Sequence, residues 1–342
     1  MNEKNNSRIR FAIVGYGHIG KRHGVMISNN PECELVAVCD NNPSEKEKLK
    51  EKGIPFYCSL EEMLNAGLTI DVLCVASPNG LHEEQAILGL RAGLHVVIEK
   101  PMALTRAGCE KIIFEALHQH RQVFCVMQNR FSPPSLWLKE IIEKKLLGDI
   151  YMVQVNCYWN RDERYYKSGN WHGTRRLDGA TLFTQFSHFI DIMFWLFGDI
   201  KNIEGKITNF NHEKITEFED SGFIHFDFIN GGMGSLNFST SVWNQNLESS
   251  ITIIAEKGTV KVGGQYMNEV ETSSIKDYTM PELKPSNPPN DYGVYKGSAA
   301  NHHFIFENVV NVLKGRETIT TNALEGMKVV EIIEKIYQSA AQ

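Results

Sequence analysis

A glycine-rich segment near the start of the chain, Gly15-Tyr16-Gly17-His18-Ile19-Gly20, has the residue types and spacing to bind phosphate groups. It follows an apolar run at 11–14 and opens an amphipathic segment. In a G-x-G-x-x-G pattern the glycines permit a tight turn, close approach of the backbone to a pyrophosphate and close helix packing, and the following helix supplies N–H donors. The segment therefore predicts a dinucleotide-binding loop, with a purely structural turn as the alternative.

An acidic side chain, Asp40, indicates which dinucleotide would bind. Asp40 ends the next apolar run, twenty residues after Gly20, where the dinucleotide fold places an acid that accepts the adenosine ribose hydroxyls. A carboxylate repels a 2′-phosphate, and Asn41 and Asn42 bring no positive charge to neutralise one. We therefore predict NAD as the cofactor, in preference to NADP. The alternative is that Asp40 caps the helix that begins near Pro43.

The elements that must position these residues change character along the chain. Up to about residue 127, short apolar runs alternate with longer amphipathic segments, which is typical of parallel strands joined by helices. The runs show no polar alternation, as expected for strands covered on both faces. They lie at 9–14, 34–39, 72–76, 94–98 and 123–126. We predict an α/β Rossmann domain over residues 1–127.

Beyond this point the apolar pattern has period two, which predicts a different kind of domain. Alternating segments occur at 150–155, 221–228, 234–242, 249–255 and 259–262. One long helical segment, 181–196, precedes most of them, and the proline-rich stretch 279–297 predicts a surface loop. We predict an α+β domain over 128–320 with a large, mostly antiparallel open sheet, and a C-terminal helix over 321–342 that packs back on the Rossmann domain.

Charge and apolar content exclude several classes of function. The 35 basic and 41 acidic residues give a net charge of −6 without a block of one sign, so neither nucleic acid nor an anionic membrane is an expected partner. The longest apolar stretch, 189–197, is interrupted by Asp191 and is shorter than the roughly 20 residues that cross a bilayer. No secretory signal precedes the first strand, so we expect a cytoplasmic protein. The seven cysteines include no C-x-x-C pair and predict reduced thiols rather than disulfides or a metal site.

Two further motifs extend the dinucleotide pattern. Val75-Ala76-Ser77-Pro78-Asn79-Gly80-Leu81-His82 and Val97-Ile98-Glu99-Lys100-Pro101 end two of the apolar runs. With the glycine loop, they resemble the signatures of the Gfo/Idh/MocA oxidoreductase family over essentially the whole chain. This resemblance implies a second domain whose sheet faces the active site on one side and a neighbouring subunit on the other, hence a homodimer or homotetramer. The cofactor-binding residues it implies are Gly15, Tyr16, Gly17, His18, Ile19, Gly20, Asp40, Ser77, Asn79, His82, Glu99, Lys100 and Gln128.

The resemblance also implies catalytic residues. The family places a lysine, here Lys100, beside the nicotinamide, and an ammonium group there would stabilise the alkoxide that develops as hydride leaves. In the family's second signature an acid precedes a histidine by four residues; the stretch 178–188 has His188 but carries Thr184 in place of the acid and Phe186 in place of a glycine. Helical spacing of four puts Thr184 and His188 on one face. His188 is therefore the candidate general base, with a satisfied core histidine as the alternative. Asp191 either orients the His188 ring or pairs elsewhere.

Arginines interleaved with aromatic residues point to the substrate. They occupy 158–176, where guanidinium groups suit a carboxylate or phosphate and rings suit a sugar or base. The segments Tyr165-Tyr166 and Trp171-His172-Gly173-Thr174, and the later stretch 297–303, resemble the family branch that oxidises the 3-hydroxyl of UDP-N-acetylglucosaminuronic acid for surface polysaccharides. The candidate substrate-binding residues are Arg161, Arg164, Tyr165, Arg175 and His188.

Two alternatives stay open for this region. In the first alternative, the arginines do not bind a substrate but form surface ion pairs with Asp162, Glu163 and Asp178. Asn301 and His302 either reach the substrate or cap the helix that follows them.

The predicted activity is therefore the NAD-dependent oxidation of a sugar ring hydroxyl, most specifically the 3-hydroxyl of a UDP-linked N-acetylated hexuronic acid. The predicted partner is a small sugar or nucleotide sugar. One alternative is an inositol or free-sugar dehydrogenase. Another is a non-catalytic regulator that senses a dinucleotide or sugar, an idea that Thr184 in the acid position keeps open.

Overall fold

The computed structural model describes residues 7–167, 171–293 and 295–340. These residues form two compact units. The first comprises the chain up to Val126 together with His302–Met327, and the second comprises Met127–Asn301 and the chain from Lys328 onward. The sequence analysis placed domain limits after residues 127 and 320, whereas the structure divides the chain after Val126, Asn301 and Met327.

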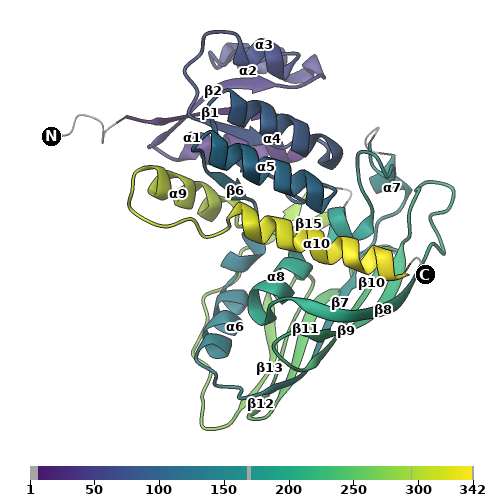
Figure 1. Ribbon diagram of the computed structural model, residues 1–342. Helices are drawn as coiled ribbons and strands as arrows, with labels where there is room; N and C mark the ends of the chain where they lie inside the picture. The colour runs from purple at the N-terminus through teal and green to yellow at the C-terminus, as the bar shows by residue number, and fades with distance from the viewer. Residues whose placement is uncertain (1–6, 168–170, 294, 341–342) are drawn as a thin grey trace. The chain divides into compact units, whose positions relative to one another are not determined.

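A six-stranded parallel sheet forms the centre of the first unit (Figure 1). Its strands follow the order β3-β2-β1-β4-β5-β6, and the order reverses between β1 and β4, which is the switch point where such sheets bind ligands. The strands are β1 (Ile9–Val14), β2 (Cys33–Cys39), β3 (Phe56–Tyr57), β4 (Val72–Val75), β5 (His95–Ile98) and β6 (Val123–Cys125). The predicted Rossmann fold is confirmed. The two-residue strand β3 was missed because it is too short to show a period.

Helices cover this sheet. Figure 1 shows α4 (His82–Arg91) and α5 (Arg106–His118) lying side by side, while α1 (His18–Asn29) contacts α9 (His302–Leu313). The shorter helices are α2 (Lys46–Glu51) and α3 (Leu60–Leu64), with 3-10 turns at Pro43–Glu45 and Asn79–Leu81. The strand side chains between the helices are almost completely buried, which explains their uninterrupted apolar sequence.

A seven-stranded, twisted sheet dominates the second unit (Figure 1). Its order is β13-β12-β11-β7-β10-β9-β8, in which only the central pair β7 and β10 is parallel. The strands are β7 (Ile150–Tyr158), β8 (Ile200–Thr208), β9 (Ser221–Phe228), β10 (Met233–Ser239), β11 (Glu248–Ala255), β12 (Gly258–Gly263) and β13 (Glu269–Ile275). The predicted mostly antiparallel sheet is confirmed. The edge strands β8 and β13 were missed because most of their residues are exposed or polar.

The helical segments of this unit differ from the prediction at one important place. Instead of one helix over 181–196, a π-helix at Leu182–Phe186 leads into α8 (Ser187–Phe197). α8 lies against β7 and against α6 (Pro133–Glu143). The remaining elements are a 3-10 turn at Gln128–Phe131, α7 (Glu163–Tyr166), the strand pair β14 (Pro289–Asp291) and β15 (Lys296–Ala299), and α10 (Ala323–Ala340), which begins in the first unit and continues in the second.

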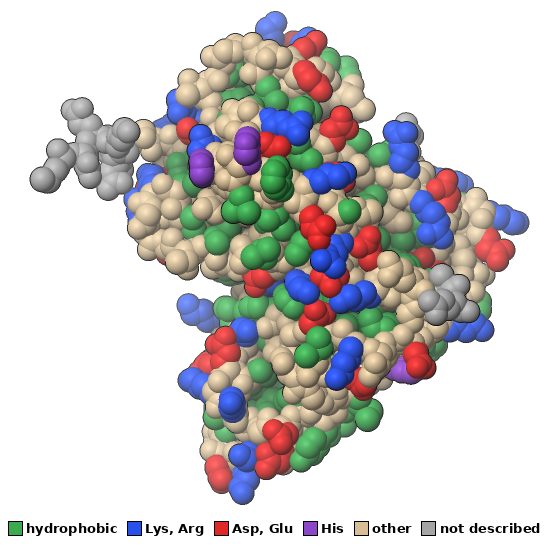
Figure 2. Space-filling view, in the orientation of Figure 1, with side chains coloured by type: hydrophobic (Ala, Val, Ile, Leu, Met, Phe, Trp, Pro, Cys, Tyr) green, Lys and Arg blue, Asp and Glu red, His purple; other side chains and the backbone are tan. Residues whose placement is uncertain are grey.

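The surface and the thiols agree with the composition. Figure 2 shows Lys and Arg side chains mixed with Asp and Glu side chains over the described residues of the visible face. Six of the cysteines are buried and Cys58 is exposed, and all seven are free thiols. Within the described ranges, no helix is both long enough and apolar enough to cross a membrane.

Candidate active site

The glycine loop joins β1 to α1 in the first unit, and a Cβ would clash at two of its three glycines. Gly15 has a φ of +84°, and a Cβ there would lie 2.5 Å from the Ser77 backbone nitrogen. A Cβ on Gly20 would lie 1.9 Å from the Gly15 carbonyl oxygen. Gly17 is the N-cap of α1, and a Cβ there would have no atom within 4 Å. No N-cap side chain therefore accepts a hydrogen bond from the first N–H groups of this helix. The loop therefore leaves the backbone donors of α1 accessible to a pyrophosphate, as the sequence predicted for an NAD site.

Asp40, directly after β2, holds this loop. Its carboxylate accepts hydrogen bonds from the backbone nitrogens of Tyr16 at 2.5 Å and Asn42 at 2.7 Å. The cap of the following 3-10 turn is the Asn42 side chain, which accepts from Ser44 at 3.0 Å. Asp40 therefore lies beside the glycine loop at the end of β2, where the ribose acid of this fold is expected.

One buried histidine connects the turns that carry Ser77 and Lys100. The His82 ring lies 2.9 Å from the Ser77 carbonyl oxygen through Nε2 and 2.8 Å from the Pro101 carbonyl oxygen through Nδ1. Burial lowers the pKa of His82. His82 thus links the loop after β4 to the turn after β5, and Lys100, at that turn, is only partly buried. Asn79 is buried at the start of its 3-10 turn.

Two histidine rings lie close to the Glu99 carboxylate. Its carboxylate lies 2.9 Å from His23 Nε2 and 3.7 Å from His302 Nε2, and it accepts from the Lys100 backbone nitrogen at 3.3 Å. Burial raises the pKa of Glu99, but the His23 hydrogen bond and nearby positive charges outweigh it and bring that pKa to about 2. Burial lowers the pKa of His302 to about 3. One ligand atom from each residue lies within 4.8 Å of the others, a grouping that the sequence analysis did not foresee.

In the second unit, His188 is the second residue of α8 and is buried. Its Nε2 lies 3.2 Å from the Gln128 amide nitrogen, which also donates to Ser298 Oγ at 3.2 Å. An amide nitrogen can only donate, so this contact favours the His188 tautomer with a lone pair on Nε2. That is the form a general base requires. Gln128, predicted to bind the cofactor, thus lies beside His188.

Thr184 lies within the π-helix and is the partly exposed member of that segment. Its hydroxyl donates to the Asp178 carboxylate and lies 2.8 Å from the Asp178 carbonyl oxygen. A π-helix makes i→i+5 contacts, so the α-helical spacing that was assumed for Thr184 and His188 does not describe this segment. The sequence stretch that departs from the family signature is therefore also locally irregular in structure.

Arg161 is the most deeply buried of the predicted substrate-binding arginines, with 2% of its surface exposed. It donates to four oxygens that are all neutral: Gln185 Oε1 at 2.7 Å, the Asn160 carbonyl at 2.6 Å, Asn246 Oδ1 at 3.1 Å and the Lys296 carbonyl at 3.1 Å. In the described part of the chain no carboxylate lies within ion-pair distance of it. Its positive charge is therefore buried without a counter-ion.

Aromatic rings surround the Arg161 guanidinium. Its central carbon lies 4.7 Å from the Trp159 ring centroid, 5.2 Å from Tyr165 and 5.0 Å from Tyr295. Gln185 connects two of the predicted residues, since it accepts from Arg161 and donates to the Tyr165 hydroxyl at 2.7 Å. The predicted pair Arg161 and Tyr165 is thus brought together by the structure.

The other two arginines lie in different surroundings. Arg164 is half exposed and pairs with Asp162, from Nη2 to Oδ2 at 2.6 Å and from Nε to Oδ1 at 3.0 Å. This is the ion pair that was the alternative interpretation of the segment. Arg175 is exposed, and its backbone nitrogen donates to Glu217 at 2.7 Å. Substrate binding by either arginine stays a prediction.

Long-range partners that no local pattern predicted complete the site. Asp191 forms a buried bidentate pair with Arg130 at 2.6 and 2.8 Å, so it pairs with a residue far away in sequence. Asn301 donates to Ser132 Oγ at 3.0 Å and accepts from Asn287 at 2.7 Å.

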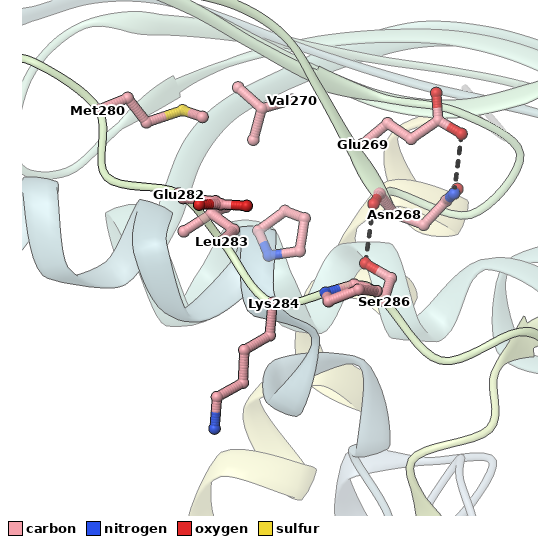
Figure 3. Close-up of a pocket in the computed structure, with 10 residues that line it drawn as sticks. Asn268, Glu269, Val270, Met280, Glu282, Leu283, Lys284 and Ser286 are labelled. Atoms are coloured by element: carbon pink, nitrogen blue, oxygen red, sulfur yellow. Dashed lines mark hydrogen bonds between the residues drawn. The ribbon is translucent and has the colours of Figure 1, made fainter.

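A separate open pocket of about 490 Å³ lies between β13 and the loop after it (Figure 3). In Figure 3 the Met280 and Val270 side chains approach one another, while Ser286 donates to the Asn268 carbonyl at 2.8 Å. The lining residues are Pro134, Asn268, Glu269, Val270, Met280, Glu282, Leu283, Lys284, Pro285 and Ser286. None of the predicted site residues belongs to this lining.

Comparison with known proteins identifies the relatives of the chain. Residues 9–127 match the oxidoreductase family with an NAD-binding Rossmann fold, and residues 136–261 match the GFO/IDH/MocA C-terminal domain. The WlbA dehydrogenase of Bordetella pertussis, solved with NADH and UDP-GlcNAcA, is 34% identical, with 98% of this chain and 97% of that chain covered and a TM-score of 0.87.

Two other relatives are similar to this chain over nearly its whole length. The WlbA dehydrogenase of Chromobacterium violaceum, also solved with NADH and UDP-GlcNAcA, is 31% identical over 98% of this chain and 94% of that chain, with a TM-score of 0.87. The D-glucoside 3-dehydrogenase of Escherichia coli is 24% identical over 98% of this chain and 96% of its own length. Together with the NAD loop, the sheet topology and the two family matches, these comparisons show that the chain belongs to the Gfo/Idh/MocA family of NAD-dependent oxidoreductases.

Proposed function

We propose that this enzyme oxidises the 3-hydroxyl of a UDP-linked N-acetylated hexuronic acid with NAD. The proposal rests on the buried charge of Arg161, whose four hydrogen bonds all end on neutral oxygens. A buried charge is costly without a partner of opposite sign, so an anionic substrate group would supply what the protein itself does not. A neutral polyol has no anionic group that could pair with Arg161.

The reaction assigns distinct roles to the two candidate catalytic residues. Bound NAD supplies the hydride acceptor. His188, in its neutral form, takes the proton of the substrate hydroxyl and becomes an imidazolium. Lys100 hydrogen-bonds the same oxygen and stabilises its developing negative charge until the carbonyl forms. Thr184 has no group that can hold this proton, which leaves His188 as the base.

The similarity to the two WlbA dehydrogenases supports the choice of sugar, because both were solved with UDP-GlcNAcA. The Tyr165 hydroxyl, hydrogen-bonded to Gln185, and the ring of His172, stacked on Tyr165 at 4.4 Å between centroids, provide a polar edge and flat faces for a sugar. Reoxidation of the cofactor by a 2-oxo acid would complete a cycle without release of NADH.

A free-sugar or polyol dehydrogenase is the second candidate function. The likeness to the D-glucoside 3-dehydrogenase of Escherichia coli over nearly the whole chain favours it. It requires no anionic group on the substrate, so it predicts that Arg161 affects folding but not the choice between charged and neutral sugars.

Homo-oligomer formation through the open face of the second sheet is part of the proposal. Met152 on β7 lies between Met233 on β10 and Ile254 on β11 in the strand register, and all three side chains are exposed. Phe223 on β9 extends the same face and is 71% exposed. An apolar row of this kind on a sheet marks a protein interaction surface. The cytoplasmic location stays a prediction.

The experiment compares substrates that differ in charge. The purified enzyme with NAD receives UDP-N-acetylglucosaminuronic acid, UDP-N-acetylglucosamine, methyl glucoside or myo-inositol, with and without 2-oxoglutarate, and NADH formation or 2-oxoglutarate consumption is recorded. We expect turnover of the uronic acid and at least tenfold lower kcat/KM for UDP-N-acetylglucosamine, which lacks the sugar carboxylate. Turnover of glucoside or inositol alone would establish the second candidate instead.

Variants of Arg161 then test whether its buried positive charge recognises an anionic group of the substrate. Arg161→Gln should raise KM for the uronic acid about tenfold more than KM for UDP-N-acetylglucosamine, and Arg161→Lys, which keeps the charge, should raise it less. Circular dichroism confirms folding of both variants. Equal losses with the substrate that carries the sugar carboxylate and with the one that lacks it would contradict the proposed role of the charge.

A further inference from the structure

Asp178 lies next to the residue that replaces the family's acid. Its side chain is 1% exposed, and its Oδ2 accepts from the Gly173 backbone nitrogen at 2.7 Å. Its Oδ1 accepts a hydrogen bond from the Thr184 hydroxyl. A carboxylate that is absent from position 184 is thus present one hydrogen bond away.

We propose that Asp178 acts through the Thr184 hydroxyl as a positioning residue for the reaction at His188, in place of the acid that the family signature carries at position 184. This inference rests on the proposed function, because it assigns a role in that same oxidation. It concerns how His188 is supported and not which sugar is oxidised.

The chemistry of a hydroxyl explains why the contact matters. Threonine has one hydroxyl proton and two lone pairs. Because that proton is donated to Asp178, the Thr184 oxygen is left to accept a hydrogen bond from another donor. A hydrogen bond to a carboxylate also makes that oxygen a stronger acceptor. Thr184 is thereby oriented and polarised, which an unsupported threonine would not be.

Burial and local backbone shape add to this argument. Thr184 is partly exposed, while its neighbours Leu182, Phe183, Gln185 and Phe186 in the π-helix are buried. π-helical segments within helices occur frequently at functional sites. The segment therefore directs Thr184 away from the core, while its hydroxyl stays joined to a buried carboxylate.

The charge of Asp178 reaches the predicted substrate-binding residues. Burial raises the pKa of Tyr165 and of Tyr166, and the negative charge of Asp178 raises the pKa of both further. When His188 takes the substrate proton, it becomes a cation, while the hydride passes to NAD and the substrate carbon becomes a carbonyl. A fixed negative charge near a developing imidazolium stabilises it, and no proton needs to reach Asp178.

Kinetics of matched variants test the proposal on whichever sugar the wild type oxidises. Asp178→Asn and Thr184→Val should each lower kcat about tenfold to a hundredfold, with KM changed less than twofold. The double variant should be no worse than either single one, because the two residues act as one unit. Asp178→Asn combined with Thr184→Asp, which moves the carboxylate to position 184, should recover at least tenfold in kcat.

Asp220 provides the matched control. It is equally buried in the same unit and also accepts from backbone nitrogens, Asn211 at 2.8 Å and Phe210 at 3.1 Å, and from the Ser221 hydroxyl at 2.8 Å. Asp220→Asn should leave kcat unchanged within twofold. Equal loss in Asp178→Asn and Asp220→Asn, or no recovery with Thr184→Asp, would overturn the proposal.

A second measurement does not depend on turnover and so separates this inference from the choice of substrate. Nuclear magnetic resonance of ring-labelled histidine follows the ring signals of His188. Asp178→Asn should shift these signals more than Asp220→Asn does, because Asp178 acts on His188 through Thr184. Absent or equal shifts would overturn the role of Asp178, whatever the enzyme oxidises.

Discussion

The pH dependence of stability should be controlled in large part by Glu219. This carboxyl group is 6% exposed and accepts a hydrogen bond from the Tyr337 hydroxyl at 2.6 Å, while the same hydroxyl accepts from the Leu182 backbone nitrogen at 3.0 Å. Burial raises the pKa of Glu219 to about 7, although the Tyr337 hydrogen bond and the Arg175 charge lower it. Glu219 is therefore protonated in the folded chain at mildly acidic pH.

The sign and size of the effect follow from the two pKa values. The folded pKa of about 7 lies above the ordinary value of 4.5, so the folded chain binds the proton more tightly than the unfolded chain does. The resulting stabilisation is fully present below pH 4.5 and is lost as the pH rises through 7. The rise in pKa corresponds to about 3 kcal/mol of unfolding free energy.

Glu219→Gln keeps the shape and the neutral state of the group, so it should remove this dependence. Urea unfolding followed by tryptophan fluorescence at pH 5 and pH 8 measures it. The variant should match the wild type at pH 5 within about 1 kcal/mol and exceed it by about 2–3 kcal/mol at pH 8. Glu217→Gln, an exposed neighbour, is the control. Parallel pH dependences of the wild type and Glu219→Gln would refute the argument.

Three further predictions concern the cofactor site, the sheet face and the buried ion pair. Gly17→Ala should keep the melting temperature but weaken NAD binding about tenfold by calorimetry, because a Cβ there meets open space in the protein. Gly20→Ala should lower both the melting temperature and the affinity for NAD. Equal melting temperatures of the two variants would contradict this. Met152→Lys on the exposed sheet face should shift sedimentation towards the monomer, and an unchanged oligomer would exclude that face. Asp191→Asn should lower stability by about 3–5 kcal/mol in urea unfolding, because it removes the buried carboxylate that binds the Arg130 guanidinium through two hydrogen bonds, and a loss below 1 kcal/mol would contradict this.

Much of the first unit could be predicted because its signals are local. The glycine loop, the acid after β2 and the turn after β5 each lie within a few residues of a strand that the apolar pattern reveals. The strand order follows from parallel pairing and short crossovers. What the sequence could not show is that His302, far along the chain, lies near Glu99, because that depends on how α9 packs against α1.

The second unit was harder to predict because its site depends on long-range contacts. The sequence identified Arg161 and Tyr165, but Gln185, which joins them, gave no local signal. A regular α-helix was expected where the π-helix lies, because a segment of five residues is too short to show which helical period it follows. The edge strands escaped detection since a solvent-exposed edge needs no apolar alternation.

Transfer of a specific hydrogen atom tests the central claim most directly. UDP-N-acetylglucosaminuronic acid carrying deuterium at C3 is incubated with the enzyme and NAD, and the cofactor and the sugar are analysed by mass spectrometry. The account predicts reduced cofactor that carries the deuterium and a nucleotide sugar that has lost one hydrogen and the label. Reduced cofactor without deuterium, or no reduction with this substrate while a neutral sugar is oxidised, would contradict it.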